Sequence, residues 1–416
     1  MDARTVCIRK GKTVNKHWFP GVIAGTYLLA MGMSLIQGKW KGDERIFHYP
    51  LTAKFAAEFP RFDLKHNYSS ASSPLPYIVA ASLGRVVGLS VASLRCMNLA
   101  LSLAALWMFL RLARLLGVRH PREVSLLLLF HPYFLLCSVV FYTPMWGMTF
   151  GLFSLYFFLR DASRYDAWLA GAWSAAAVLS RQFDMFLPAG FVLLALRDGW
   201  TAKRAVPWGK LAALCAPQVL PLLLFMYWGG ISSPDFTQHE IGLKPMNLVF
   251  FVAMVGFYYG WTTLYARFPR RHLLWLAVGL PPFFLFMPNW SDYQGMETMT
   301  GLVMHVCSLG GRFVPGGTAT LVFGLYVAGF VVLVDALRQA RETTPREQAL
   351  WLLMALFLGV MSVNVASAER HFVGCIPLLI LALRRPWPGL AIRLAGAVTG
   401  FVSFAYLFFW LFISNK

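Results

Sequence analysis

Long apolar runs separated by short polar segments make up most of the chain. The first run, residues 19–37, follows a basic stretch and has no small-residue A-x-A cleavage site after it, so it predicts an uncleaved signal-anchor helix. Twelve more runs follow, at 94–110, 124–142, 145–159, 166–180, 183–196, 210–229, 246–266, 272–289, 315–337, 347–366, 372–383 and 390–413. A membrane-crossing helix needs roughly 20 apolar residues. The pattern therefore predicts an all-α polytopic membrane protein, a single domain over residues 1–416 with about 13 transmembrane helices, in which 372–383 is short enough for a half-helix.

One further apolar run, residues 75–92, is able either to cross the membrane or to lie on its surface. If it lies on the surface, six basic loops face the inside and carry 19 Lys and Arg, against five outside after residue 95. If it crosses, every later loop changes side and the ratio is reversed. Cytoplasmic loops carry an excess of Lys and Arg. We therefore predict a surface helix here, with the N-terminus inside and the C-terminus outside.

The first outer loop, residues 38–93, has an internal pattern of its own. Phe47, Leu51, Phe55 and Phe59 recur every four residues, with polar side chains between them. This spacing predicts an amphipathic helix at the membrane surface. Together with residues 75–90 the loop is predicted to form two interfacial helices, and the adjacent acids at positions 43 and 44 begin the first of them.

Composition agrees with a membrane protein and excludes other classes. The chain is 58% hydrophobic and only 13% charged, whereas soluble domains carry roughly 25% charged residues. The net charge of +19 does not indicate nucleic-acid binding, because the basic residues form short clusters between apolar runs, as orientation signals do. The six cysteines are scattered without a C-x-x-C pair, which is typical of unpaired small hydrophobic residues.

The predicted topology places several unusual polar residues on the outer face. Taken singly, each is more readily explained as a solvated or interfacial side chain. That explanation is weaker for SRQFD at 180–184, because charge between two apolar runs is costly and usually paired or functional. A site on the outer face, roofed by the first loop, is the simplest prediction. Its candidates are Asp43, Glu44, His48, Asp63, Tyr142, Arg181, Gln182, Asp184, His239, Glu240, Glu369, Arg370 and His371.

An ordered set of motifs resembles a known family. DERIFHYPLTA (43–53) is similar to a D-E-x-F-H-x-P-x-A motif that follows the first span. FD (62–63), ASSPLPY (71–77), LRCMNLALS (94–102), FYTP (141–144), RQFD (181–184) and, more loosely, ERHFVGCIP (369–377) follow in the same order. Together they resemble the GT-C superfamily of glycosyltransferases, and in particular the dolichyl-phosphate-glucose-dependent α-1,2-glucosyltransferases. The match covers the first 190 residues well and the rest thinly, and Pro144 stands where the family has an aspartate.

The resemblance implies a GT-C-like fold and the transfer of a glucose-like hexose from a polyprenyl- or dolichyl-phosphate sugar to a lipid-linked glycan or similar acceptor. The reaction would be inverting and would occur on the periplasmic or lumenal face. Such a reaction needs a base for the acceptor hydroxyl and a cation for the departing phosphate. Asp43 is the expected base, and Glu44 is the second choice or a ligand of acceptor hydroxyls.

The remaining candidates are expected to bind substrate. Arg181 and Arg370 suit the phosphate, since a guanidinium gives planar bidentate contacts. His48 would orient a carboxylate or reach the phosphate, Tyr142 and Gln182 would line the sugar pocket, and His371 completes the set of substrate-binding candidates.

No cofactor is expected. A divalent metal is not favoured, because Pro144 occupies the position where a second acid would help to hold it and no cluster of His, Asp and Glu has ligand spacing. The chain has neither a P-loop nor a dinucleotide glycine motif, so a lipid-linked donor is expected rather than a nucleotide sugar.

Two other classes stay open. A polytopic transporter or a lipid-linked-sugar flippase would show inverted repeats or charged, broken helices in mid-membrane, and a non-catalytic membrane scaffold would need none of these residues. The predicted partners are membrane lipids, the lipid-linked donor and the acceptor, with no nucleic acid. A bacterial inner membrane and the endoplasmic reticulum both suit the sequence.

Overall fold

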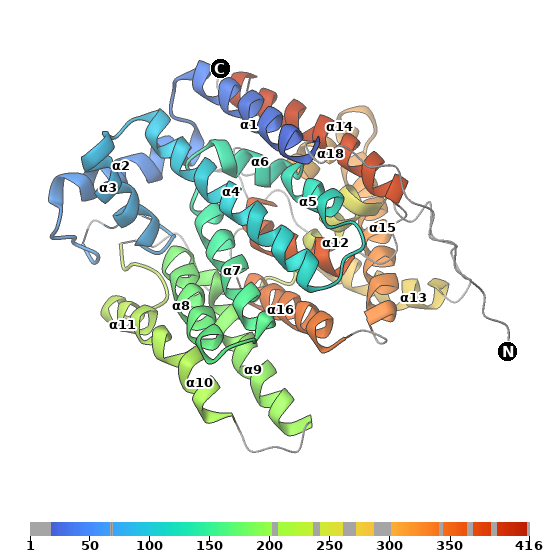
Figure 1. The fold of residues 1–416 in the computed structure, drawn as a ribbon. Helices are drawn as coiled ribbons and strands as arrows, with labels where there is room; N and C mark the ends of the chain where they lie inside the picture. Colours follow the sequence, from blue (N-terminus) through green and yellow to red (C-terminus); the bar gives the residue numbers. More distant parts are fainter. Residues whose placement is uncertain are drawn as a thin grey trace.

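The computed structural model describes residues 18–66, 68, 70–201, 207–235, 242–260, 272–286, 301–340, 344–363, 369–383 and 389–413. Within these ranges every regular element is a helix (Figure 1). The helices are α1 (Trp18–Gln37), the π-helix η1 (Glu44–His48), α2 (Tyr49–Glu58), α3 (Leu75–Val87), α4 (Val91–Leu115), α5 (Pro121–Leu129), α6 (Pro132–Val139), α7 (Thr143–Arg160), α8 (Arg164–Ser180), η2 (Gln182–Met185), α9 (Phe186–Thr201), α10 (Trp208–Cys215), η3 (Ala216–Gln218), α11 (Val219–Trp228), α12 (Met246–Tyr259), α13 (His272–Leu285), α14 (Leu302–Phe313), α15 (Gly317–Ala340), α16 (Pro345–Met361), η7 (Glu369–Cys375), α17 (Ile376–Ala382), α18 (Gly389–Phe408) and η8 (Phe409–Ile413).

Five helical segments of the described chain are long and apolar enough to cross a membrane. They are Trp18–Gln37, Val91–Leu115, Trp208–Trp228, Gly317–Arg338 and Ile392–Ile413. The bent pair α5 and α6 raises the number to six if it counts as one span. The helices α7, α8 and α9 are shorter, at 18, 17 and 16 residues. The described part of the chain is thus all-helical, with several helices long and apolar enough to span a membrane, and the total of thirteen remains a prediction.

The apolar run at 75–92 does not form one continuous helix. The helix α3 ends at Val87 because Gly88 adopts a left-handed φ of 83°, and Ser90 caps the start of α4. The 13 residues of α3 extend only about 20 Å, at a rise of 1.5 Å per residue, which is less than the roughly 30 Å hydrocarbon core. This length fits the predicted surface helix. The predicted first amphipathic helix is also present, as η1 followed by α2.

The run at 124–142 departs from the expected straight span. It is divided into α5 and α6, which meet at an angle of 67°. Pro132 begins α6, and a proline there has no N–H with which to continue the preceding helix. Ser403 caps the break from outside by donating its hydroxyl proton to the Phe130 carbonyl.

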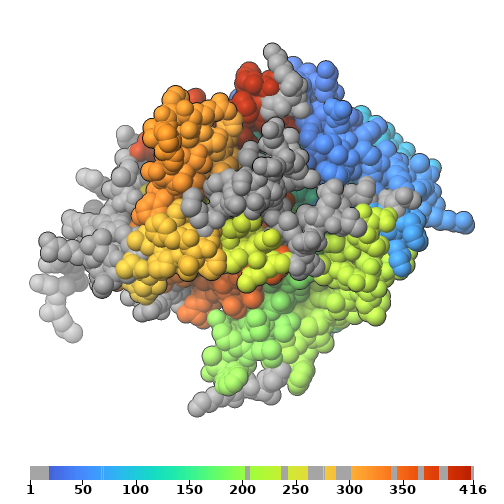
Figure 2. Space-filling model, turned by 180° about the vertical axis from the view of Figure 1, so that it is seen from behind, coloured from blue at the N-terminus to red at the C-terminus, as the bar shows by residue number. Residues whose placement is uncertain are grey.

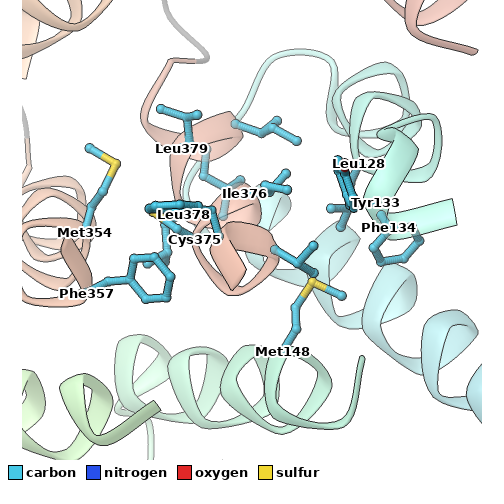
Figure 3. Packing of buried hydrophobic residues seen from close by; sticks show 14 of the residues in the cluster. Leu128, Tyr133, Phe134, Met148, Met354, Phe357, Cys375, Ile376, Leu378 and Leu379 are labelled. Carbon is cyan, nitrogen blue, oxygen red and sulfur yellow. The ribbon is translucent and has the colours of Figure 1, made fainter. Parts of the chain in front are cut away.

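The short run at 372–383 forms the predicted half-helix, α17, preceded by the 3₁₀-helix η7. Figure 3 shows α17 inside the bundle, with Met354 and Phe357 of α16 on one side and Tyr133 of α6 on the other. Met148 of α7 packs against it from a third side. The continuous segment formed by η7 and α17, which begins with Glu369 and Arg370, is therefore fixed in the centre of the largest hydrophobic core.

A second, smaller core lies beneath the first outer loop, where α2 packs against α3. Phe55 and Tyr77 from the loop are fully buried there beside Phe141 and Trp146. Trp228 at the end of α11 joins this core and donates its indole N–H to the Leu64 carbonyl at 2.6 Å. Seen from behind, the blue first-loop segment lies next to the yellow-green α11 (Figure 2). The loop is therefore a folded layer attached to the helical bundle.

Candidate active site

Asp43 lies directly after a glycine turn that follows α1. Gly42 has a left-handed φ of 45°, a conformation that side chains rarely adopt. A Cβ at this glycine would lie 3.3 Å from the Tyr142 hydroxyl oxygen and 3.4 Å from the Trp410 ring. The absence of a side chain at position 42 therefore brings the backbone that carries Asp43 close to Tyr142.

The Asp43 carboxylate forms an ion pair with Arg370. Its Oδ2 atom lies 2.7 Å from Nη1 of Arg370, and the two side chains are 24% and 18% exposed. Asp43 comes from the first outer loop and Arg370 from η7, near the other end of the chain. Two of the residues selected from the sequence thus meet at a partly open position, where both remain accessible to a ligand.

Glu44 has different surroundings from its neighbour. Its side chain is fully buried and forms an ion pair with Arg95 at 2.7 Å. It also accepts hydrogen bonds from the backbone N–H groups of Phe141 at 2.9 Å and Lys41 at 3.2 Å. This geometry does not fit the expectation that Glu44 acts as a second base or binds an acceptor hydroxyl, because both of its oxygens are occupied inside the protein.

His48 and Tyr142 lie near the ion pair. The ring of His48 meets that of Tyr142 at a centroid distance of 5.7 Å, and only 6% of His48 and 4% of Tyr142 are exposed. His48 Nδ1 is 2.8 Å from the Tyr77 hydroxyl. Burial lowers the pKa of His48 to about 4, although the charge of Asp43 acts in the opposite direction. The imidazole is therefore neutral at physiological pH and is fixed by a residue of the first loop.

Arg181 and Gln182 follow α8 at the start of η2. Arg181 is 5% exposed. In the described part of the chain its guanidinium makes no hydrogen bond and no ion pair, and it lies 5.8 Å from the centre of the Phe183 ring. The charges of Asp184 and Arg370 both act on it. Arg181 is thus a buried cation near the Asp43–Arg370 pair without a hydrogen-bonded counter-ion.

The Gln182 side chain bonds to the first outer loop and does not line an open sugar pocket. Its amide Nε2 donates to the Ala71 carbonyl, and its Oε1 is buried without a hydrogen-bond partner among the described residues. Ser72 is joined to Thr143 of α7 by a hydroxyl contact of 2.9 Å. We call residues 70–77 the roof segment. These contacts hold the roof segment against α7 and η2.

Asp184 lies behind Arg181, away from solvent. Its side chain is 3% exposed, and its Oδ2 has no hydrogen-bond partner in the described chain. Gly147 of α7 makes room for it, since a Cβ there would overlap that oxygen. The carboxyl group borders a cavity of about 20 Å³, which has space for one water molecule. Asp184 therefore places a buried carboxyl group close to Arg181 without hydrogen-bonding to it.

The remaining candidates are not all brought into this group. His371 follows Arg370 on η7 and is half-buried. Asp63 is in the first loop, where it accepts hydrogen bonds from the backbone N–H groups of Lys65 and His66. His239, Glu240 and the side chain of Glu369 lie outside the described residues. In the ranges that the structure covers, no group of three or more His, Cys, Asp or Glu has an arrangement suited to a metal ion.

Two residues of α4 belong to the site although neither is among the candidates predicted from the sequence. Arg95 is fully buried and donates to the Glu44 carboxylate, and the Asn98 side-chain amide donates to the Tyr142 carbonyl. Both lie in LRCMNLALS, one of the motifs that carry the family resemblance. An arginine at the start of an apolar run was the available signal, because a charge at that position needs a partner.

Comparisons with known proteins give a structural likeness only. No protein-family model and no curated protein matches the chain. The crystal structure of ArnT from Cupriavidus metallidurans bound to undecaprenyl phosphate is 15% identical, with a TM-score of 0.48 over 95% of this chain and 78% of that one. The apo structure of the same protein is 14% identical, with a TM-score of 0.46 over 94% and 77% of the two chains. We therefore argue function from the geometry of the site itself.

Proposed function

We propose that this protein is an integral-membrane glycosyltransferase. It moves a glucose-like hexose from a polyprenyl- or dolichyl-phosphate sugar to a lipid-linked glycan or a similar acceptor, on the non-cytoplasmic face. The observation that carries the proposal is the pairing of a partly exposed carboxylate, Asp43, with Arg370, next to the buried Arg181, whose guanidinium makes no hydrogen bond to a carboxylate among the described residues. A carboxylate for a hydroxyl proton and guanidinium groups for a phosphate are the two parts that this reaction needs.

In the proposed reaction Asp43 is the general base. Its carboxylate takes the proton of the acceptor hydroxyl while that oxygen attacks the anomeric carbon of the donor sugar. The bond between the anomeric carbon and the phosphate oxygen breaks at the same time, and the electron pair leaves with the polyprenyl phosphate. Attack opposite to the leaving group inverts the anomeric centre.

The two arginines have different electrostatic roles in the proposed reaction. Arg181 has no hydrogen-bonded carboxylate to give up among the described residues, so its guanidinium is available for the donor phosphate. Arg370 holds the Asp43 carboxylate in place in the free enzyme. Desolvated cations act more strongly on developing negative charge than exposed ones do. The burial of Arg181 therefore favours the release of the phosphate.

A lipid-linked donor suits the surroundings of the site. Asp43 lies between α1, an apolar helix of spanning length, and η1 with α2, the predicted interfacial helices. A sugar phosphate at headgroup depth would reach this position while its tail stays among the spans. We propose that the donor enters from the lipid and that the acceptor meets it below the roof segment.

Substitution of Asp43 by asparagine tests the proposal. We expect Asp43→Asn to lower transfer of radiolabelled hexose from a polyprenyl-phosphate sugar to membrane lipid extract by about 10²- to 10⁴-fold, the usual contribution of a positioned base. The thermal midpoint in detergent and the affinity for undecaprenyl phosphate should be unchanged. Asp63→Asn in the same loop is the matched control and should retain activity. Unchanged transfer by the Asp43 variant would overturn the assignment.

A transporter or flippase is the second candidate, and the bent pair α5 and α6 is the observation that favours it. Broken helices with buried polar groups are common at transport sites. His131 stands at the break, is 2% exposed, and its Nδ1 has no hydrogen-bond partner within the described ranges. Flux of a labelled polyprenyl-phosphate sugar across proteoliposomes by both wild type and Asp43→Asn, with no transfer by either, would establish this alternative.

A further inference from the structure

Arg95 is the centre of a buried hydrogen-bond network behind Asp43. It is fully buried on α4, and its Nε and Nη2 atoms donate to the two carboxylate oxygens of Glu44 at 3.1 and 2.7 Å. Its Nη1 also donates to the Ser34 carbonyl of α1 at 2.5 Å, and its Nη2 donates to the Lys39 carbonyl at 2.7 Å. One guanidinium therefore fixes the end of α1, the turn after it and Glu44.

Glu44 carries the network onward to the segment between α6 and α7. Its Oε1 accepts from the Phe141 N–H at 2.9 Å, and its Oε2 accepts from the Lys41 N–H at 3.2 Å. Asp43 thus lies between Gly42, which has a left-handed backbone, and Glu44, which is anchored by both oxygens. The backbone of the candidate base is constrained on both sides.

Asn98 extends the same network, one helical turn after Arg95. Its side-chain Nδ2 donates to the carbonyls of Val140 at 2.8 Å and Tyr142 at 3.0 Å, and its Oδ1 accepts from the Trp146 indole at 2.9 Å. These bonds fix the segment that places Tyr142 against Gly42. Two residues of α4 therefore fix the two chain segments on either side of Asp43: the turn after α1 and the segment that ends in Tyr142.

We propose that Arg95 and Glu44 are positioning residues, which hold the Asp43 carboxylate at the angle needed for proton transfer. This inference rests on the proposed function. A buried ion pair is poor evidence for stability, because desolvation offsets most of its attraction and an apolar pair of similar size is often as stable. Its value here is geometric, since it joins four chain segments around one reactive side chain.

Two variants separate positioning from folding. Glu44→Gln keeps the size of the side chain and an acceptor for Phe141 N–H, and the double variant Glu44→Leu with Arg95→Met removes both charges together. A misplacement of about 1 Å can cost roughly 10²-fold in rate. We expect kcat to fall by about 10- to 100-fold in both, with the donor KM within about twofold of wild type.

Asp166→Asn is the matched control. Asp166 is also a fully buried carboxylate that pairs with an arginine, but it lies in the first turn of α8. Its partner Arg160 ends α7, about 25 Å from the start of that helix at 1.5 Å per residue. The Asp166→Asn variant should lower the thermal midpoint in detergent as much as Glu44→Gln does and should leave kcat unchanged. Equal losses of kcat in Asp166→Asn and Glu44→Gln would show a stability effect and overturn the inference.

A second measurement does not depend on transfer. Asp43→Cys and Arg370→Cys are introduced together, and the yield of a short thiol cross-link is compared with and without Glu44→Gln. We expect a high yield with Glu44 and a yield at least several-fold lower without it. An unchanged yield would overturn the positioning role, whereas an absence of transfer by the wild type would overturn the proposed function alone.

Discussion

Asp43 and Glu44 are neighbours in the chain, and the fold separates their environments. The Asp43 side chain is 24% exposed and holds one ion pair, whereas that of Glu44 is fully buried and holds four hydrogen bonds. A carboxylate with a single partner can exchange that partner for a ligand. A carboxylate with every oxygen occupied cannot do so without leaving buried donors unpaired, which is costly. The two adjacent acids therefore suit different tasks, reaction and anchoring.

At the same scale, Arg181 should determine the affinity for the donor. Arg181→Ala removes a cation that makes no hydrogen bond within the described chain, so we expect the thermal midpoint to change little. The donor KM should rise by about 10- to 100-fold, the value of a charged hydrogen bond to phosphate. Titration with undecaprenyl phosphate checks the same effect on binding.

Arg312→Ala, an exposed arginine on α14, is the control for loss of one positive charge. It should leave the donor KM unchanged. An equal weakening in both variants would indicate a general electrostatic effect and would remove Arg181 from the site.

The sequence could identify Asp43 and Arg370 as candidates, because both are charges at the outer ends of apolar runs. It could not pair them, since nothing local relates positions so far apart. Glu44 was assigned a similar task to Asp43 for the same reason: the environment that distinguishes them is made by Arg95 and Phe141. Charge placement was predictable, but the partner of each charge depends on tertiary structure.

At the scale of helices, the charge count predicted the surface character of residues 75–92, and α3 ends at Gly88 in agreement with its short length. The break between α5 and α6 was missed. An average of hydropathy over 124–142 is insensitive to the direction of the backbone, and Pro132 was the local signal that a single helix could not continue.

Helix packing gives a prediction for α12 and α15. Gly256 and Gly329 let the two helices approach closely, as small residues do in membrane bundles. A Cβ at Gly256 would overlap the backbone of α15, with the Leu325 carbonyl carbon only 2.7 Å away. We expect Gly256→Ala to lower the stability by about 1–3 kcal/mol, measured as the thermal midpoint in detergent.

Gly324→Ala is the control. Gly324 lies on α15, the partner helix of α12, and nothing lies within 4 Å of its Cβ position. Its thermal midpoint should equal or slightly exceed that of wild type, since alanine favours helix. If both variants behaved alike, the close approach of α12 and α15 would not contribute to stability.

For the whole molecule, the basic loops and the candidate site are predicted to face opposite sides of the membrane. His66, exposed in the first loop, and Arg164, exposed between α7 and α8, mark the two sides. Cysteine introduced by His66→Cys should react with a membrane-impermeant maleimide in intact cells. Cysteine introduced by Arg164→Cys should react only after permeabilisation. The opposite pattern would invert the topology and place the site on the cytoplasmic face.

Arg370 stands at the entrance to α17, and α17 is enclosed by α16, α7 and the bent pair. A helix held on every side cannot adjust independently when its neighbours tilt. Membranes of different thickness impose different tilts on spanning helices, and such a change would pass through α17 to the guanidinium beside Asp43. Host lipids would then act on the chemistry mechanically, and turnover would be fastest in a membrane whose acyl chains match the height of this bundle.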